Sequence, residues 1–231
     1  MLKIEKLNQF YGESHTLWDI DLELEEAKVN CLMGRNGVGK TTLLNCIMGL
    51  QAVRSGSILF NGQDLTKVNA ERRAALGIGY VPQGRQIFPL LTVRENLQIG
   101  LAARADKAKR VPDFIFELFP VLKDMLNRRG GDLSGGQQQQ LAIGRALVVD
   151  PSLLILDEPT EGIQPNIVQE IGDIIMKLSQ DIGLTVLLVE QKLPIVRRIA
   201  DNFTILDRGR KVASGQIDEL SEELISQYLT V

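Results

Sequence analysis

One short segment constrains the fold of this chain more than any other. Residues 34–42 read Gly-Arg-Asn-Gly-Val-Gly-Lys-Thr-Thr and match the pattern G-x-x-x-x-G-K-[ST]. Glycines allow positive φ angles and a close approach to phosphate groups, while N–H groups at the start of the following helix point inward. An apolar strand pattern at 29–33 and a helical pattern from Thr42 onward supply the context that this motif requires. The segment, here called the phosphate loop, therefore predicts a nucleoside-triphosphate site in an α/β core.

The phosphate loop is expected to bind ATP together with Mg²⁺. Lys40 can reach the β and γ phosphates as a compact charge, and Thr41 can place its hydroxyl group on the metal ion. All nine residues of the loop are expected to contact the nucleotide: Gly34, Arg35, Asn36, Gly37, Val38, Gly39, Lys40, Thr41 and Thr42.

A second part of the site is predicted at the end of an apolar run, residues 153–156, which is followed by two acidic residues. Asp157 is expected to hold magnesium, directly or through water. Glu158 is expected to orient the attacking water and to act as the general base. Lys40 and Glu158 are thus the first two predicted catalytic residues.

The hydrophobic patterns along the chain predict two kinds of sheet. Residues 18–24 alternate apolar and charged side chains, which indicates a half-buried antiparallel strand, and residues 57–62 resemble a partner strand. The runs at 29–33, 153–156 and 185–189 are almost wholly apolar, as in strands buried on both faces of a parallel sheet.

Helical patterns separate these strands and predict a doubly wound α/β core. They lie at about 40–50, 137–149 and 165–180, with Pro165 suited to a first helical turn. The stretch from about 88 to 132 contains helical segments at 93–104, 112–119 and 121–128 and no convincing strand, so it is interpreted as a helical insertion. The chain is predicted to be one domain, 1–231, with subdomains at about 1–87, 88–134 and 135–231.

Charge, cysteine spacing and the lengths of apolar runs argue against several other classes of protein. The formal charge of −3 argues against a nucleic-acid binder that works through a basic face. Cys31 and Cys46 show no zinc or redox spacing and are expected to be buried thiols in a reducing compartment. The first residues lack a signal-peptide core, and no apolar run reaches the roughly 18 residues of a membrane span. The chain is expected to be soluble and cytoplasmic.

A second loop of the phosphate-binding kind follows the helical insertion. Residues 133–137 read Leu-Ser-Gly-Gly-Gln and directly precede a predicted helix, so Ser134 and two glycines form another anion-binding helix start. A nucleotide held fully by the phosphate loop does not need this second loop, here called the signature loop.

Over its whole length the chain resembles the ATPase subunits of ABC transporters. The phosphate loop matches their Walker A motif, Asp157 and Glu158 match the Walker B end, and residues 133–137 match the LSGGQ signature. The resemblance implies a P-loop NTPase (RecA-like) α/β core with an N-terminal antiparallel β subdomain and a helical insertion. It also implies that Gln83 lies at the metal ion, that Tyr11 stacks on adenine, and that a neighbouring subunit's ATP is closed by Ser134, Gly135, Gly136 and Gln137.

The resemblance further implies partners and a place of work. A second ATPase subunit would complete the site, and membrane permeases would dock near Gln83, with contacts expected at Arg85, Phe88, Pro89 and Leu90. The protein would be peripheral on the cytoplasmic face of the membrane. The segments 133–146 and 157–165 are most similar to the branch that imports branched-chain amino acids and urea. In particular, they resemble a urea-type ATPase that pairs with a second, non-identical ATPase.

The sequence departs from the family pattern at two positions. Gln191 occupies the place of the usual histidine and is the third predicted catalytic residue, able to position groups but not to exchange a proton near neutral pH. Gln164 stands where an aspartate is usual. Both departures favour a site completed by a different ATPase subunit. The only histidine of the sequence, His15, is expected to lie in a loop.

Three rival functions remain to be weighed. A soluble ABC-type ATPase of DNA or ribosomes is disfavoured by the acidic balance and by the presence of a single such domain without coiled coils. A P-loop GTPase or small-molecule kinase would leave the signature loop unexplained. An exporter or a lipid-extraction ATPase is set aside only by the branch resemblance.

Overall fold

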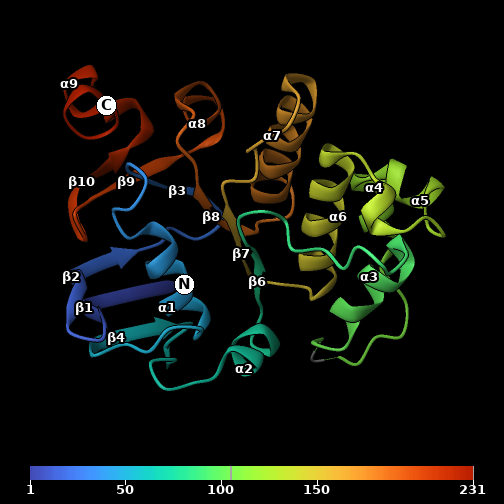
Figure 1. Ribbon diagram of the computed structural model, residues 1–231, viewed down its shortest axis with the longest axis horizontal. Coiled ribbons are helices and arrows are strands. Elements are labelled where there is room, and N and C mark those ends of the chain that lie inside the picture. The colour runs from blue at the N-terminus through green and yellow to red at the C-terminus, as the bar shows by residue number, and fades with distance from the viewer. Residues whose placement is uncertain (105, 231) are drawn as a thin grey trace.

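The computed structural model describes residues 1–104 and 106–230 and contains two β-sheets with helices around them (Figure 1). The larger sheet has the strand order β10-β9-β3-β8-β7-β6, and the smaller one β2-β1-β4-β5. Two hydrophobic cores fill the space around the larger sheet. The predicted α/β core with an antiparallel subdomain and a helical insertion is therefore confirmed.

The larger sheet is parallel from β9 to β6, and β10 adds an antiparallel edge. Its strands are listed here in chain order: β3 (Val29–Met33), β6 (Ile78–Val81), β7 (Leu153–Asp157), β8 (Thr185–Val189), β9 (Asn202–Asp207) and β10 (Arg210–Gln216). Alternate residues of a strand enter different cores, with Leu154 and Leu156 in one and Leu153 and Ile155 in the other. Burial on both faces explains the almost continuous apolar runs in the sequence.

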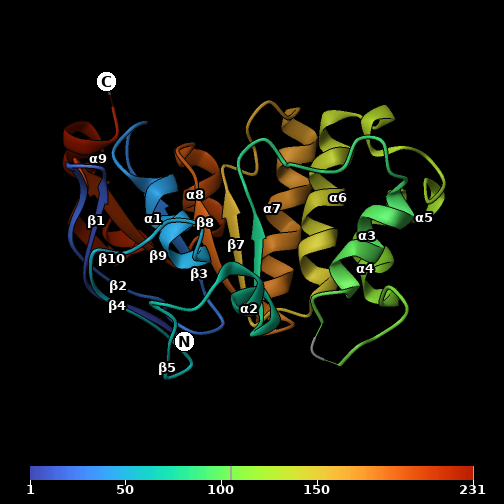
Figure 2. The same ribbon diagram turned by 60° about the horizontal axis from the view of Figure 1, so that its bottom comes forward.

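Helices cover the two faces of this sheet (Figure 2). One face carries α1 (Lys40–Met48), which packs with the smaller sheet, and the other carries α6 (Gly135–Val148) and α7 (Pro165–Gln180). The C-terminal part adds α8 (Leu193–Ile199), the short 3₁₀ helix η2 (Ile217–Glu219) and α9 (Glu222–Tyr228). No helix within residues 1–104 and 106–230 is both long and apolar enough to cross a membrane.

The smaller sheet differs from the sequence-based expectation in its pairing. It consists of β1 (Leu2–Tyr11), β2 (Ser14–Glu23), β4 (Ser55–Phe60) and β5 (Gln63–Asp64). The expected strands at 18–24 and 57–62 lie in it, but β1, which was not predicted, stands between them and pairs with both. His15 is also not a loop residue: it belongs to β2, where its ring is stacked between Phe10 and Trp18 at centroid distances of 4.0 and 3.5 Å.

The insertion is helical, as predicted, but its helices are shorter. It contains α3 (Val93–Leu101), α4 (Asp113–Leu118), α5 (Pro120–Asp124) and the 3₁₀ helix η1 (Gly130–Asp132), and α2 (Ala70–Ala75) precedes it. The helix expected at 121–128 ends at Asp124, because the following chain turns back onto the start of α3. There the N–H groups of Val93 and Arg94 donate to the carbonyl oxygens of Arg128 and Leu126 at 2.9 and 3.0 Å.

Candidate nucleotide site

Four of the predicted site segments gather at the carboxyl edge of the parallel strands. The phosphate loop follows β3, Gln83 follows β6, Asp157 ends β7 with Glu158 after it, and Gln191 follows β8. Since β3, β8, β7 and β6 are neighbours in that order, four segments distant in sequence meet at one edge. This is where open α/β sheets bind their ligands.

The phosphate loop folds tightly because glycines occupy its strained positions. Gly34 has φ +142°, and a Cβ atom there would lie 2.4 Å from the Leu206 carbonyl oxygen. Gly39 has φ +111° and precedes α1 without any side-chain cap on the helix N–H groups. Uncapped N–H groups at the start of a helix leave donors for an anion, so the loop suits a phosphate group.

Lys40 places a buried cation in the centre of this loop. Only 5% of Lys40 is exposed, and its ammonium group donates to the carbonyl oxygens of Gly34 at 2.8 Å and Arg35 at 3.0 Å. The Glu158 carboxylate lies 3.8 Å away. Burial lowers the pKa of the Lys40 ammonium, while the charges of Glu158 and Asp157 act in the opposite direction.

Thr41 and Asp157 form a pair of oxygen groups that fits a magnesium ion. The Thr41 hydroxyl donates to Asp157 Oδ2 at 3.3 Å, and the Asp157 side chain is buried. Burial, followed by the charge of Glu158, raises the pKa of the Asp157 carboxyl to about 6. Hard oxygen ligands suit Mg²⁺, and a bound divalent cation would balance the clustered carboxylates and favour the ionised form of Asp157.

Glu158 is surrounded by the two predicted glutamines. The Gln191 amide nitrogen donates to Glu158 Oε1, and that of Gln83 donates to Glu158 Oε2 at 3.3 Å and to Glu161 Oε2 at 3.0 Å. Glu158 itself has φ +49°, a conformation that is costly for a residue with a side chain and that is found preferentially at functional sites. The structure thus places the Gln83 amide on two glutamates, of which Glu158 directly follows Asp157 in the chain.

The other residues predicted to contact nucleotide lie around the loop. Tyr11 is 48% exposed, and its hydroxyl lies 3.5 Å from that of Thr42. Its ring is therefore free for stacking beside the loop. Asn36 accepts a hydrogen bond from the Gln191 amide at 2.8 Å, whereas the Arg35 guanidinium turns to the carbonyl oxygen of Thr230.

The signature loop lies away from the phosphate loop. Ser134 caps α6 by accepting from the Gln137 N–H at 3.4 Å, while the Gln137 side chain accepts from the Ser134 N–H at 2.9 Å. Both views show α1 and α6 apart, with β6 and β7 between them (Figures 1 and 2). A hollow of about 550 Å³ beside the signature loop is lined by Ser134, Gly135, Gly136, Gln137, Gln164 and Glu170, among others, and by none of the described residues 34–42.

Comparison with known proteins identifies the family in which this arrangement of site residues occurs. A family model described as ABC transporter matches residues 17–161, which include the phosphate loop, Gln83, the signature loop and Glu158. The chain belongs to the ABC transporter family. It is therefore an ATPase, and the resemblance found in the sequence is confirmed.

Relatives of the ABC transporter family match almost the whole chain. A probable branched-chain amino acid transport ATP-binding protein, LivF, from Archaeoglobus fulgidus is 42% identical over 96% of this chain and 94% of its own length. The high-affinity branched-chain amino acid transport ATP-binding protein BraG from Pseudomonas aeruginosa is 41% identical over 92% of this chain and 91% of its own.

Solved ABC cassettes have the same fold. A dimeric cassette in a post-hydrolysis state, bound to ADP and phosphate, superposes with a TM-score of 0.83 at 25% identity and covers 94% of this chain and 99% of its own. A nucleotide-free cassette from an ABC transporter gives 0.84 at 28% identity and covers 99% and 94%. The predicted P-loop NTPase fold is thus confirmed.

Sequence reasoning missed several residues at this ABC ATPase site. Glu161 shares Gln83 with Glu158, and Thr160 donates its hydroxyl hydrogen to the buried carboxylate of Glu190. Lys192 donates to the Thr160 carbonyl oxygen at 2.7 Å. The only signal in the sequence was their position directly after the predicted strands, at the edge where the other site residues lie.

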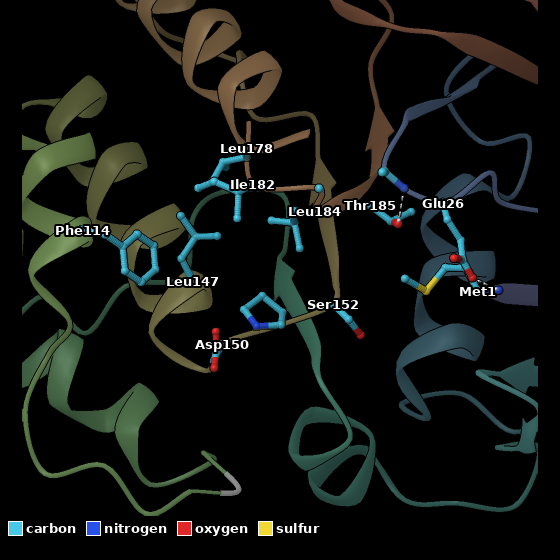
Figure 3. Close-up of a pocket in the computed structure, with 13 residues that line it drawn as sticks. Met1, Glu26, Phe114, Leu147, Asp150, Ser152, Leu178, Ile182, Leu184 and Thr185 are labelled. Carbon is cyan, nitrogen blue, oxygen red and sulfur yellow. Dashed lines mark hydrogen bonds and ion pairs between the residues drawn. The ribbon is translucent and has the colours of Figure 1, made fainter. Parts of the chain in front are cut away.

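A second hollow, of about 380 Å³, lies at the opposite edge of the sheet and contains none of the predicted site residues (Figure 3). Leu147, Leu178, Ile182 and Leu184 form its apolar wall, and Ser152 and Thr185 mark the amino ends of β7 and β8. Ligands of open α/β sheets bind at the carboxyl ends of the strands, so this hollow is not the nucleotide site of the ABC ATPase.

Proposed function

We propose that this ABC ATPase powers an importer of branched-chain amino acids. The observation that carries the proposal is the whole-length similarity to two branched-chain amino acid transport ATP-binding proteins, at 42% and 41% identity. Urea as the cargo, which the resemblance of segments 133–146 and 157–165 also implied, stays a prediction. The similarity thus favours the importer over the exporter and lipid-extraction alternatives.

Uptake measurements distinguish the cargoes. In the source organism, deletion of the gene is expected to lower uptake of radiolabelled leucine, isoleucine and valine, and to leave urea uptake unchanged. Wild-type chain supplied in trans should restore uptake, whereas Glu158→Gln should not. Loss of urea uptake alone would assign the chain to urea, and no loss of either uptake would contradict the importer proposal.

The ATP site proposed here is shared between two subunits. One subunit would present five side chains to ATP and Mg²⁺, namely Lys40, Thr41, Asp157, Glu158 and Gln191. The Tyr11 ring of the same subunit would stack on adenine. The signature loop of a second ATPase subunit would close the site. Within one subunit the signature loop cannot do so, because it lines a hollow that the phosphate loop of the same subunit does not reach. Gln164 lines that hollow and makes no capping hydrogen bond to α7, so it is available to the partner. Gln164 and Gln191 favour a non-identical partner.

Ser134→Asp tests the shared site. Aspartate is a good N-cap, so α6 should keep its start, but the added negative charge would repel a phosphate group. We expect ATP hydrolysis to fall at least about tenfold, while the ATP affinity of the isolated chain changes little. The repulsion between two like charges a few ångström apart costs more than about 1 kcal/mol at the low dielectric of a closed site. Ser221→Asp, at the equivalent cap of α9, is the matched control. A normal rate for Ser134→Asp would contradict a role of the signature loop in hydrolysis.

Gln191 is proposed to hold Glu158 in position for water activation. Its amide nitrogen donates to the Glu158 carboxylate and also to Asn36 Oδ1, at 2.8 Å from the latter. Gln191→Ala is expected to slow single-turnover hydrolysis about tenfold with little change in ATP affinity, because it misplaces the base without removing it. Rapid-quench measurement with excess enzyme checks this. An unchanged rate would show that Gln191 has no part in the reaction.

Permease subunits are proposed to dock at a groove beside the helical insertion. The groove, of about 420 Å³, is lined by Tyr80, Phe88 and Ile99, and Phe88 and Ile99 are 44% and 41% exposed. Leu90, two residues after Phe88 in the chain, is 80% exposed. Arg85 is less suited than expected, because its guanidinium group already donates to the Glu161 carbonyl oxygen at 3.2 Å.

The chain is proposed to act as a single ATPase domain whose three subdomains meet at this groove, while the first and third supply the nucleotide site. Docking to permeases would place it on the cytoplasmic face of the membrane. Nucleic acid is not among its proposed partners, and that absence stays a prediction.

A further inference from the structure

Glu190, the residue before Gln191, carries a buried carboxylate that the proposed function does not use. Only 3% of Glu190 is exposed. Its Oε2 accepts from the Thr160 hydroxyl at 2.5 Å, and its Oε1 accepts from the backbone N–H groups of Gln191 at 2.8 Å and Lys192 at 3.1 Å. A hydroxyl group and two peptide groups therefore stabilise this charge.

These hydrogen bonds join the two segments that carry Glu158 and Gln191. Thr160 lies two residues after Glu158, in the loop that follows β7, and Gln191 and Lys192 follow β8. Lys192 Nζ donates back to the Thr160 carbonyl oxygen at 2.7 Å, and the Glu158 N–H donates to the Val189 carbonyl oxygen at 2.9 Å. The two loops are thus fastened together on both sides of the Gln191 and Glu158 contact.

Packing alone would not select a carboxylate side chain at position 190. A carboxylate removed from water is costly unless hydrogen bonds compensate it, and an apolar side chain would fill the same space at no such cost. The charge of Glu190 also acts on Lys40, in the direction that raises the pKa of the ammonium group, and it adds to the negative charge where phosphate is to bind. What Glu190 supplies is two acceptor atoms at a fixed spacing, one for each loop.

We propose that Glu190 is a positioning residue for ATP hydrolysis. Its carboxylate orders the backbone at 191–192 against the Thr160 loop, and this holds the Gln191 amide on the Glu158 carboxylate. Glu190 touches neither substrate nor the attacking water and acts through Gln191. The inference rests on the proposed role of Gln191 in the reaction.

Glutamine at position 190 can reproduce the same contacts. Its amide oxygen in place of Oε1 would accept from both backbone N–H groups, and its NH₂ group in place of Oε2 would donate to the Thr160 hydroxyl oxygen, which can also accept. Glu190→Gln therefore keeps the connection between the loops without the charge, whereas Glu190→Ala leaves three donors without their acceptor.

The test compares single-turnover hydrolysis rates and ATP dissociation constants in the full chain. Glu190→Ala is expected to slow the single-turnover rate about tenfold, with the ATP dissociation constant within about threefold of wild type, because it disturbs orientation more than binding. Glu190→Gln should recover the rate to within about threefold. In a Gln191→Ala background, Glu190→Ala should slow the reaction little further, since its effect passes through Gln191.

Each outcome decides a separate point. Independent, multiplicative effects of Glu190→Ala and Gln191→Ala would overturn the inference, and so would a wild-type rate for Glu190→Ala beside a slow Gln191→Ala. A wild-type rate for Gln191→Ala would instead contradict the proposed role of Gln191. If Glu190→Ala does not fold, Thr160→Val is compared with Thr160→Ser instead. A slow valine variant beside a near-normal serine variant supports the positioning role of Glu190, and equal rates overturn it.

Discussion

Replacement of Glu158 by glutamine is expected to reduce ATP hydrolysis by about 10² to 10⁴-fold, the usual contribution of a positioned general base. ATP binding should persist, because the phosphate loop and Lys40 are unchanged. Glutamine cannot take a proton from water. It also has one amide oxygen where Glu158 uses two carboxylate oxygens, one for the Gln191 amide and one for the Gln83 amide, so one of these contacts is lost.

Glu161→Gln is the matched control for this variant. Glu161 lies three residues further along, carries the same charge and shares the Gln83 amide, at 3.0 Å. We expect its hydrolysis rate to stay within about threefold of wild type, since it neighbours the base without contacting Gln191. Phosphate release and equilibrium ATP binding, measured for both variants, check the prediction. Equal losses in the two variants would mean that local negative charge, rather than a base at Glu158, matters.

The sequence was sufficient to predict the α/β core and the phosphate loop for a physical reason. Strands β3, β7 and β8 are buried on both faces, so their apolar runs stand out. Each has a predicted site residue at its carboxyl end or within two residues after it. The loop after β3 also needs glycine where φ is positive, as at Gly34 and Gly39, which makes its pattern specific.

The arrangement around Glu158 could not be predicted in the same way. Gln83, Glu158 and Gln191 come together only because β6, β7 and β8 are adjacent, and strand order is a long-range property of the fold. The short strand β6, Ile78–Val81, contains Gly79 and was not recognised. Likewise, an acidic residue after a strand is usually at the surface, so no local pattern indicates that Glu190 is buried and accepts a hydrogen bond from Thr160.

The pairing of the smaller sheet shows the same limit. Residues 18–24 and 57–62 were correctly assigned to strands, since alternation is local, but the insertion of β1 between them depends on contacts across the sheet. The position of β1 matters for the site, because its last residue is Tyr11, whose hydroxyl lies 3.5 Å from that of Thr42. A tertiary contact thus brings the proposed adenine-stacking ring to the phosphate loop.

Replacement of Lys40 by alanine is expected to weaken ATP binding as well as to stop hydrolysis, which separates it from Glu158→Gln. Lys40 is the buried cation of the loop, 5% exposed, and its ammonium group is held by the Gly34 and Arg35 carbonyl oxygens. A hydrogen bond to a charged group is worth about 1.5–3 kcal/mol, so its loss should raise the ATP dissociation constant about 10 to 100-fold.

Lys28→Ala is the control, because Lys28 directly precedes β3 whereas the phosphate loop follows it, and because its exposed ammonium group pairs with Asp201 at 2.9 Å. Removing the same charge there should leave ATP affinity within about twofold, since exposed ion pairs contribute little. Calorimetric titration of both variants with Mg²⁺ and ATP separates local from global charge effects. If Lys40→Ala bound ATP normally and lost only turnover, Lys40 would act on the developing charge of the reaction alone, and the nucleotide would be held by the N–H groups at the start of α1.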